Sequence, residues 1–152
     1  NSSLSSECAD TYSGSGAGSE AESSAVISRL ERIHRTSKLV GFFTIHSYGQ
    51  FLLTAYGYKS MTYPSHYEEL MLNGLRASYM IRKQYGTSYT VGNEASGGSD
   101  DYVTSEYNLT YSYTIELPDQ GRHGFVLPPI YIKVVGKQLI SLLTSILSNY
   151  QD

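Results

Sequence analysis

The sequence predicts an α/β fold in which helices pack on a β-sheet that this chain does not complete. Three segments repeat apolar residues at helical spacing, and two other segments are rich in strand-forming residues. In chain order these segments alternate as helix, strand, helix, strand and helix. Two strands offer too little apolar surface for three helices, so we expect the rest of the sheet to come from another segment.

The first predicted helix spans residues 19–34. Ser19 is a suitable N-cap, and Glu20 and Glu22 then fall in the first turn, where the helix dipole favours negative charge. Its apolar stripe consists of Val26, Ile27, Leu30 and Ile33.

The second predicted helix spans residues 65–85 and ends before Gly86, a residue type that commonly terminates helices. A polar segment at 92–101 is predicted to be a loop, and a last helix follows Pro129. The two apolar stripes consist of Leu70, Met71, Leu75 and Tyr79, and of Val135, Leu139, Leu142, Leu143, Ile146 and Leu147.

The two predicted strands differ in pattern. Residues 38–46 are almost continuously apolar, which is typical of a strand buried on both faces. Residues 107–117 are rich in Tyr, Thr and Ile, which favour sheets.

The length and net charge of the chain limit the classes of partner that it can have. A chain of 152 residues can bury a real core, and its 11 basic and 14 acidic side chains give a net charge of −3. This balance argues against a nucleic acid or an anionic membrane as partner, because both require clustered Lys and Arg. No apolar run approaches the roughly 18 residues that span a bilayer. We therefore expect no nucleic-acid partner and no membrane partner.

The start of the chain is expected to lie inside a larger protein, because residue 1 is Asn and no signal-peptide pattern follows. Residues 1–18 are predicted to form a loop ahead of a core at 19–152. Sequons at Asn1 and Asn108 are compatible with secretion. The single cysteine, Cys8, is either an incidental thiol or, in a secreted protein, the partner of a cysteine elsewhere.

Five strings carry the information on function. They are CADTY at 8–12, SEAE at 19–22, TIHSYGQ at 44–50, ASGGSDD at 95–101 and TIELPDQGRHGF at 114–125. In their order and spacing, they resemble the zinc carboxypeptidases of the digestive A/B type. The resemblance implies that residues 1–152 are the C-terminal portion of one catalytic domain, the C-terminal half of a mixed central sheet flanked by helices. It also implies a secreted, zinc-dependent enzyme that removes C-terminal residues from peptide substrates.

His46 ends the first predicted strand. A lone histidine at a strand end is more often a hydrogen-bonded structural residue than a metal ligand. The resemblance places the family's third zinc ligand on His46 and the other two on a His-x-x-Glu motif upstream, outside this chain. It thus implies one Zn²⁺ per complete enzyme and a partner, the upstream half of the same enzyme, which a separate chain would provide if the protein is cleaved.

A second His-x-x-Glu string, His66 to Glu69, also occurs in this chain. It follows the His46 strand instead of preceding it, and it opens a predicted helix whose first turn favours Glu in any case. We therefore interpret it as structural. His34 and His123 are interpreted as surface or loop residues.

Glu116 lies near the end of the second predicted strand. A carboxylate among apolar residues is costly to bury unless it is paired or functional, so a salt-bridged structural role is the alternative. The resemblance implies that Glu116 is the general base and acid, taking a proton from the water that zinc activates and giving it to the leaving amine.

Asp100 bears on specificity. It is a common turn residue, but its position in ASGGSDD matches the floor of the family's pocket for the C-terminal side chain. The resemblance then implies a preference for Lys or Arg, because a carboxylate in a desolvated pocket favours a cationic guest. Ser47 and Tyr48 are implied to contact the peptide upstream of the scissile bond, although packing or a backbone hydrogen bond would also explain them.

The chain departs from the family at several positions. Asn93 stands where a mobile Tyr closes over the substrate's carboxylate, and Tyr89 nearby is a candidate replacement. Pro118 stands where an Arg is usual. Cys8 matches a family cysteine whose disulfide partner lies upstream. The isolated chain is expected to be inactive, and the alternative function is a carboxypeptidase-like binding protein or inactive fragment without turnover.

Overall fold

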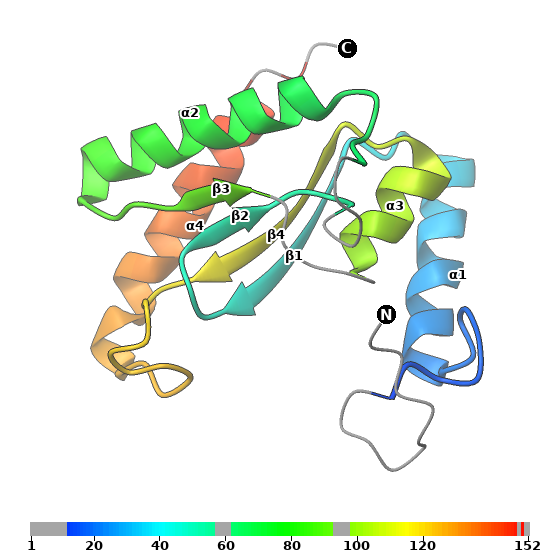
Figure 1. Ribbon diagram of the computed structural model, residues 1–152, viewed down its shortest axis with the longest axis horizontal. Coiled ribbons are helices and arrows are strands. Elements are labelled where there is room, and N and C mark those ends of the chain that lie inside the picture. The colour runs from blue at the N-terminus through cyan, green and yellow to red at the C-terminus, as the bar shows by residue number, and fades with distance from the viewer. Residues whose placement is uncertain (1–11, 57–61, 93–97, 149, 151–152) are drawn as a thin grey trace. The chain divides into compact units, whose positions relative to one another are not determined.

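The computed structural model describes residues 12–56, 62–92, 98–148 and 150. Cys8 and Asn93 lie outside the described residues. The elements are α1 (Ala21–Thr36), β1 (Gly41–Ser47), β2 (Phe51–Leu53), α2 (Tyr67–Tyr85), β3 (Thr90–Gly92), α3 (Ser99–Tyr107), β4 (Tyr111–Leu117), a 3₁₀ turn η1 (Pro129–Tyr131) and α4 (Ile132–Leu147) (Figure 1). They fall into two compact units, residues 1–39 and residues 40–152.

The first unit contains α1. The predicted helix is confirmed, but the capping role of Ser19 is wrong. The helix begins at Ala21 with Glu20 in the N-cap position. The Ser19 hydroxyl instead donates to the Glu20 carboxylate at 2.9 Å and accepts from the backbone N–H of Gly16. The hydroxyl is therefore already engaged upstream of the helix.

The second unit is built on a four-stranded mixed sheet with the order β1-β4-β2-β3. β1 and β4 are parallel, β2 runs antiparallel to β4, and β2 and β3 are parallel. The α/β prediction is confirmed, but the prediction of two strands was wrong. β2 and β3 contain only three residues each, which is too short to give a periodic signal.

Helix α3 was also missed, because the polar Gly/Ser/Asp string that opens it was interpreted as loop. It has two carboxylates in its first turn, where the helix dipole favours them, and it ends at Asn108 in the left-handed conformation. The predicted strand at 107–117 therefore starts only at Tyr111.

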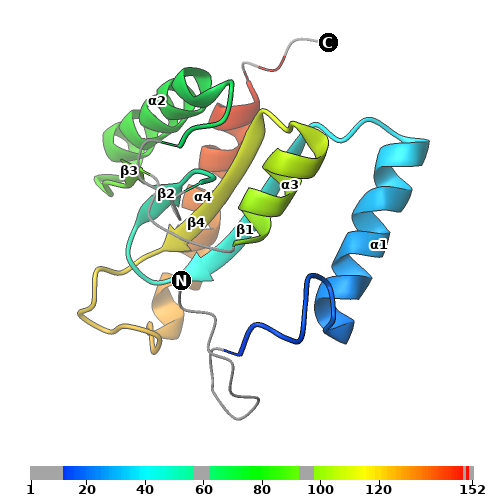
Figure 2. The same cartoon turned by 45° about the vertical axis from the view of Figure 1, so that its right-hand side comes forward.

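The helices cover both faces of this sheet. α2 and α4 pack on one face and α3 lies against the other, along β1 and β4 (Figures 1 and 2). The core lies between the sheet and the α2/α4 pair. Its fully buried side chains include Leu52, Leu70, Ala77, Ile81, Tyr113, Ile115, Leu142 and Ile146.

The buried face of α2 differs from the predicted stripe. Leu75 and Tyr79 are exposed, whereas Leu70, Gly74, Ala77 and Ile81 are buried. Small residues allow the helix to approach the sheet closely: a Cβ on Gly74 would lie only 2.8 Å from the Cγ1 of Val91. The prediction failed because it weighted large apolar residues and ignored small ones.

The 19-residue segment Pro129–Leu147 is long and apolar enough to cross a membrane by length and composition, with a mean hydropathy of 1.5 over an 18-residue window. The expectation that no run approaches membrane-spanning length was therefore wrong. Leu142 and Ile146 of this segment are fully buried in the core, which explains part of its apolar character.

Candidate active site

The two residues singled out for chemistry meet in the sheet. His46 on β1 and Glu116 on β4 are register partners in the parallel pair. Adjacent strands lie about 4.8 Å apart, and residues in register direct their side chains to the same face. The sheet therefore brings together an imidazole and a carboxylate that are 70 positions apart in the chain. Figure 1 shows the two strands that carry them, β1 and β4, side by side.

The His46 ring is held by a neighbour on its own strand. Thr44 lies two residues earlier, on the same face, and its hydroxyl is 2.8 Å from Nε2 of His46. This contact leaves the other ring nitrogen, Nδ1, as the one available to a metal. Histidine ligands of zinc usually have such a partner on the second nitrogen. The sequence analysis missed Thr44, although the two-residue spacing could have indicated it.

Glu116 has an unsatisfied oxygen. Its Oε2 is shielded from solvent and has no hydrogen-bond partner within the described part of the chain. Desolvating a carboxylate oxygen without pairing it is costly, so such a group is more typical of a site than of a structural ion pair. The salt-bridge alternative therefore receives no support from the described residues.

Asp100 lies on the same face of the sheet, at the start of α3. It is 2% exposed, and its Oδ1 has no hydrogen-bond partner among the described residues. Burial, and next the nearby charge of Asp101, raise the pKa of Asp100, while hydrogen bonds that include one from the Thr114 hydroxyl oppose the shift. The Ser112 hydroxyl donates to the Asp100 carbonyl. β4 thus presents Ser112, Thr114 and Glu116 in a row, with Asp100 beside the first two.

A loop that follows β4 packs against Tyr48. The Tyr48 and Phe125 rings meet edge to face with centroids 4.9 Å apart. Asp119 and His123 of the same loop are paired at 2.7 Å, so His123 is a loop residue, as predicted, with a defined partner. Phe125 and Asp119 were not predicted to take part.

Other predicted residues are less clearly placed. Ser47 ends β1 in register with Leu117, and strand alternation directs its side chain away from the face of His46. Tyr89 is 5% exposed in the core, and burial raises its pKa to about 12. The core lies on the α2/α4 side of the sheet, opposite His46 and Glu116. Tyr89 is therefore not placed to act for the family's mobile tyrosine, whose position Asn93 occupies in this chain.

The donor chemistry of His46 fits a zinc ligand. His46 is exposed at the end of its strand and has a free ring nitrogen, and Glu116 stands beside it. Among the residues that the structure describes, no group of three His, Cys, Asp or Glu side chains is arranged to hold a metal.

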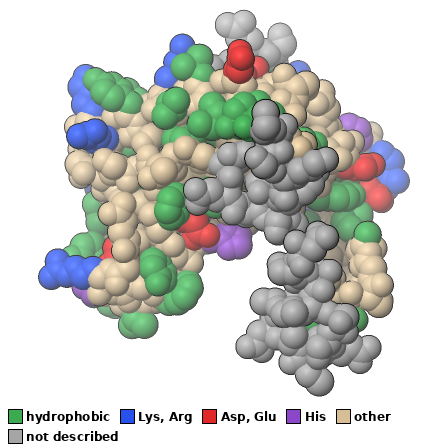
Figure 3. Space-filling view, viewed as in Figure 1, with side chains coloured by type: hydrophobic (Ala, Val, Ile, Leu, Met, Phe, Trp, Pro, Cys, Tyr) green, Lys and Arg blue, Asp and Glu red, His purple; other side chains and the backbone are tan. Residues whose placement is uncertain are grey.

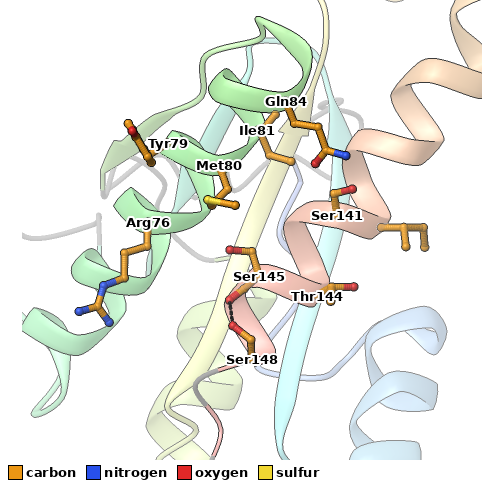
Figure 4. Close-up of a pocket in the computed structure, with 10 residues that line it drawn as sticks. Arg76, Tyr79, Met80, Ile81, Gln84, Ser141, Thr144, Ser145 and Ser148 are labelled. Atoms are coloured by element: carbon orange, nitrogen blue, oxygen red, sulfur yellow. Dashed lines mark hydrogen bonds between the residues drawn. The ribbon is translucent and has the colours of Figure 1, made fainter.

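A hollow of about 620 Å³ lies between α2 and α4, lined by Tyr79, Met80 and Ser145 among others (Figure 4). These helices pack on the sheet face opposite His46 and Glu116, so the hollow is separate from this chemistry. It is lined largely by apolar and hydroxyl side chains and carries no carboxylate or imidazole.

Comparison with known proteins places this arrangement in context. The family described as zinc carboxypeptidase matches residues 1–141. The chain is 36% identical to human carboxypeptidase O over 149 residues and 39% identical to bovine carboxypeptidase B over 132 residues. These matches cover 93% and 83% of this chain, but only 39% and 31% of the relatives.

A solved structure agrees with the fold. The carboxypeptidase A from Helicoverpa armigera matches with a TM-score of 0.80 and 31% identity, and the match covers 95% of this chain. The match covers 37% of that structure. The chain thus spans less than two fifths of the length of these three proteins.

Proposed function

This chain belongs to the zinc carboxypeptidase family, and we propose that it is the C-terminal part of an enzyme that removes C-terminal residues from peptides. In this proposal, His46 is one zinc ligand and Glu116 is the general base and acid. The observation that carries the proposal is the shared register of His46 and Glu116, with the Glu116 oxygen Oε2 unpaired beside the imidazole.

The chemistry assigns one role to each side chain. Zinc, when bound, lowers the pKa of water and polarises the scissile carbonyl. Glu116 accepts a proton from the attacking water and delivers it to the leaving nitrogen as the C–N bond breaks. Its shielded oxygen can stay close to the reacting atoms without being neutralised by a cationic side chain among the described residues. Thr44 holds the His46 ring in one orientation.

The upstream portion of the protein is proposed to complete the site, either in one continuous chain or as a separate one. The supporting observation is the position of β1 at one end of the sheet order, beside β4 only. Its outer edge has no partner strand in the described part of the chain and can accept another. The same upstream portion would provide the remaining two zinc ligands.

We propose a preference for C-terminal Lys or Arg. Asp100 is buried and has an unpaired oxygen, and a cationic guest would relieve its desolvation. The relatives include both A-type and B-type carboxypeptidases, so the preference rests on Asp100 alone. Tyr48 and Asn93 are proposed to contact the substrate, Tyr48 on the peptide upstream of the scissile bond. Any contact from Ser47 would have to come from its backbone, because its side chain is directed away from the face of His46.

Secretion and a disulfide are also part of the proposal. Both rest on the family resemblance of Cys8 and its surrounding string, which lies outside the described residues. The cysteine partner would belong to the upstream portion.

A second function, peptide binding without turnover, is motivated by Pro118 and Asn93, which replace polar groups that the family places around the substrate. Hydrolysis decides between the two. The full-length protein, loaded with zinc, is assayed on matched peptides that end in Arg or in Phe. Turnover of either peptide excludes the binding-only function, and binding without turnover excludes the enzyme.

The variant Glu116→Gln sharpens this test. It keeps the size of the side chain but removes the base, so kcat should fall about 10³-fold, within the range for a general base. Zinc content, measured by mass spectrometry, should not change. Glu106→Gln is the matched control, because Glu106 is an exposed carboxylate on α3. Full activity in Glu116→Gln would refute the assigned role.

A further inference from the structure

The loop between β4 and the 3₁₀ turn η1 is organised around one carboxylate. Asp119 Oδ1 accepts hydrogen bonds from the backbone N–H groups of Gly121 at 2.8 Å and Gly124 at 3.3 Å. Its Oδ2 accepts from the backbone N–H of His123 at 2.8 Å and lies 2.7 Å from Nδ1 of the same residue. Both oxygens are thus committed to folding the loop back on itself.

The folded loop packs against Tyr48. Gly121 and Gly124 have φ values of +106° and +57°, which residues with a Cβ rarely adopt. A Cβ on Gly121 or Gly124 would lie 3.7 Å or 3.4 Å from the Tyr48 ring, which is ordinary van der Waals distance, so both glycines lie next to this ring. Phe125 contacts the same ring edge to face. Three residues of one loop therefore lie beside a tyrosine two positions after His46, and this tyrosine remains 39% exposed.

The outer side of this loop is exposed. Phe125 and Val126 are 79% and 80% exposed, and Figure 3 shows hydrophobic side chains beside basic and histidine side chains at this end of the molecule. Packing on the outside therefore does little to hold the loop in place. Its conformation depends on the hydrogen bonds to Asp119 and on the contact with Tyr48.

We infer that Asp119 is a positioning residue, which folds the loop over Tyr48 and so fixes the Tyr48 ring for contact with peptide residues upstream of the scissile bond. The inference rests on the proposed function in its last step, the contact of Tyr48 with peptide. Asp119 itself touches no reacting group: it acts through the glycine backbone and the aromatic ring. The lowered pKa of Asp119 agrees with this: desolvation raises it, but the four hydrogen bonds outweigh that effect and bring it to about 2.

The variant Asp119→Asn tests the inference in the full-length, zinc-loaded protein. The amide keeps the shape but loses the charge and one of the two acceptor oxygens. Trypsin cleavage after Arg122, inside the loop, should become about tenfold faster, the effect of losing one hydrogen bond to a charged group. This readout does not depend on peptidase activity.

Kinetics provide the second readout. For a tetrapeptide substrate, KM should rise about tenfold with kcat unchanged, because only binding upstream of the scissile bond is loosened. For a dipeptide substrate with the same C-terminal residue, both constants should remain as in the wild type. A merely structural role would lower activity on both substrates alike, and that result would overturn the inference.

Two controls complete the design. Glu106→Gln removes an exposed charge elsewhere and should change neither readout. His123→Phe removes one of the four hydrogen bonds and keeps a ring against Tyr131, so it should give a smaller change in the same direction if Asp119→Asn does not fold. If the wild type hydrolyses no peptide, the proposed function fails, whereas the trypsin readout and the affinity for the tetrapeptide still decide the role of Asp119. Unchanged trypsin cleavage in Asp119→Asn would overturn it.

Discussion

His46 on β1 and Glu116 on β4 occupy the same rung of a parallel strand pair. The next rung on this face pairs Thr44 with Thr114. Thr44 holds the His46 ring, and Thr114 hydrogen-bonds the Asp100 carboxylate. Two neighbouring pairs on one face of the sheet therefore connect the proposed metal ligand, the proposed base and the proposed specificity residue.

Thr44→Val should weaken zinc binding. The substitution keeps a β-branched side chain but removes the hydroxyl that lies 2.8 Å from Nε2 of His46. Loss of such an outer partner typically lowers metal affinity by about 10–100-fold. Competition with a chromophoric chelator measures the affinity in the full-length protein. Thr44→Ser, which restores the hydroxyl, should recover most of it, and equal affinity in all three proteins would contradict the role of Thr44.

Asp100→Asn should raise stability and lower the preference for basic residues at neutral pH. The pKa of Asp100 is raised by burial and by the charge of Asp101, so its ionisation disfavours folding. Below pH 3.8, the pKa of Asp100 in the unfolded chain, the residue is protonated in both states and costs no stability. Above its raised pKa in the folded protein, the full loss of stability applies. The variant should therefore unfold at a higher temperature than the wild type at pH 7, and the difference should vanish below about pH 4.

The specificity of the same variant is measured separately. The ratio of kcat/KM for Arg-ended over Phe-ended peptides should fall about a hundredfold, as for other buried charge pairs that lose one partner. In the wild type, this ratio should decline as pH falls through the raised pKa, because protonated Asp100 no longer attracts a cation. A ratio that is unaffected by the substitution would remove Asp100 from the specificity pocket.

Tyr113→Phe should destabilise the core. Tyr113 is fully buried, and its hydroxyl donates to the Leu70 carbonyl of α2 at 2.7 Å. Loss of this bond should lower the free energy of unfolding by about 1 kcal/mol, as measured by urea denaturation. Tyr79→Phe is the matched control. Tyr79 lies on α2, as Leu70 does, and is 64% exposed, so its loss of a hydroxyl should change the free energy of unfolding by no more than about 0.5 kcal/mol. Equal effects would show that the hydroxyl of Tyr113 contributes nothing to linking α2 to β4.

Long periodic segments were predictable, and short or polar ones were not. Gly86 terminates α2 in the left-handed conformation, as its residue type indicates. The three-residue strands β2 and β3 have no period of their own and exist because β4 and its neighbours offer them hydrogen-bond partners. Helix α3 was hidden by turn-forming residues that, at a helix N-terminus, satisfy the dipole instead. From the sequence alone, Tyr89 could lie on either side of the sheet, and only the structure places it in the core.

The sequence by itself determined the fold class, the family and the chemical types at His46, Asp100 and Glu116, because each motif is a local string. Only the tertiary structure decided that His46 and Glu116 share a rung, that Thr44 orients the imidazole and that Asp119 folds a loop onto Tyr48. Strand register and loop packing depend on contacts between residues distant in the chain, and these contacts have no signature within any single segment.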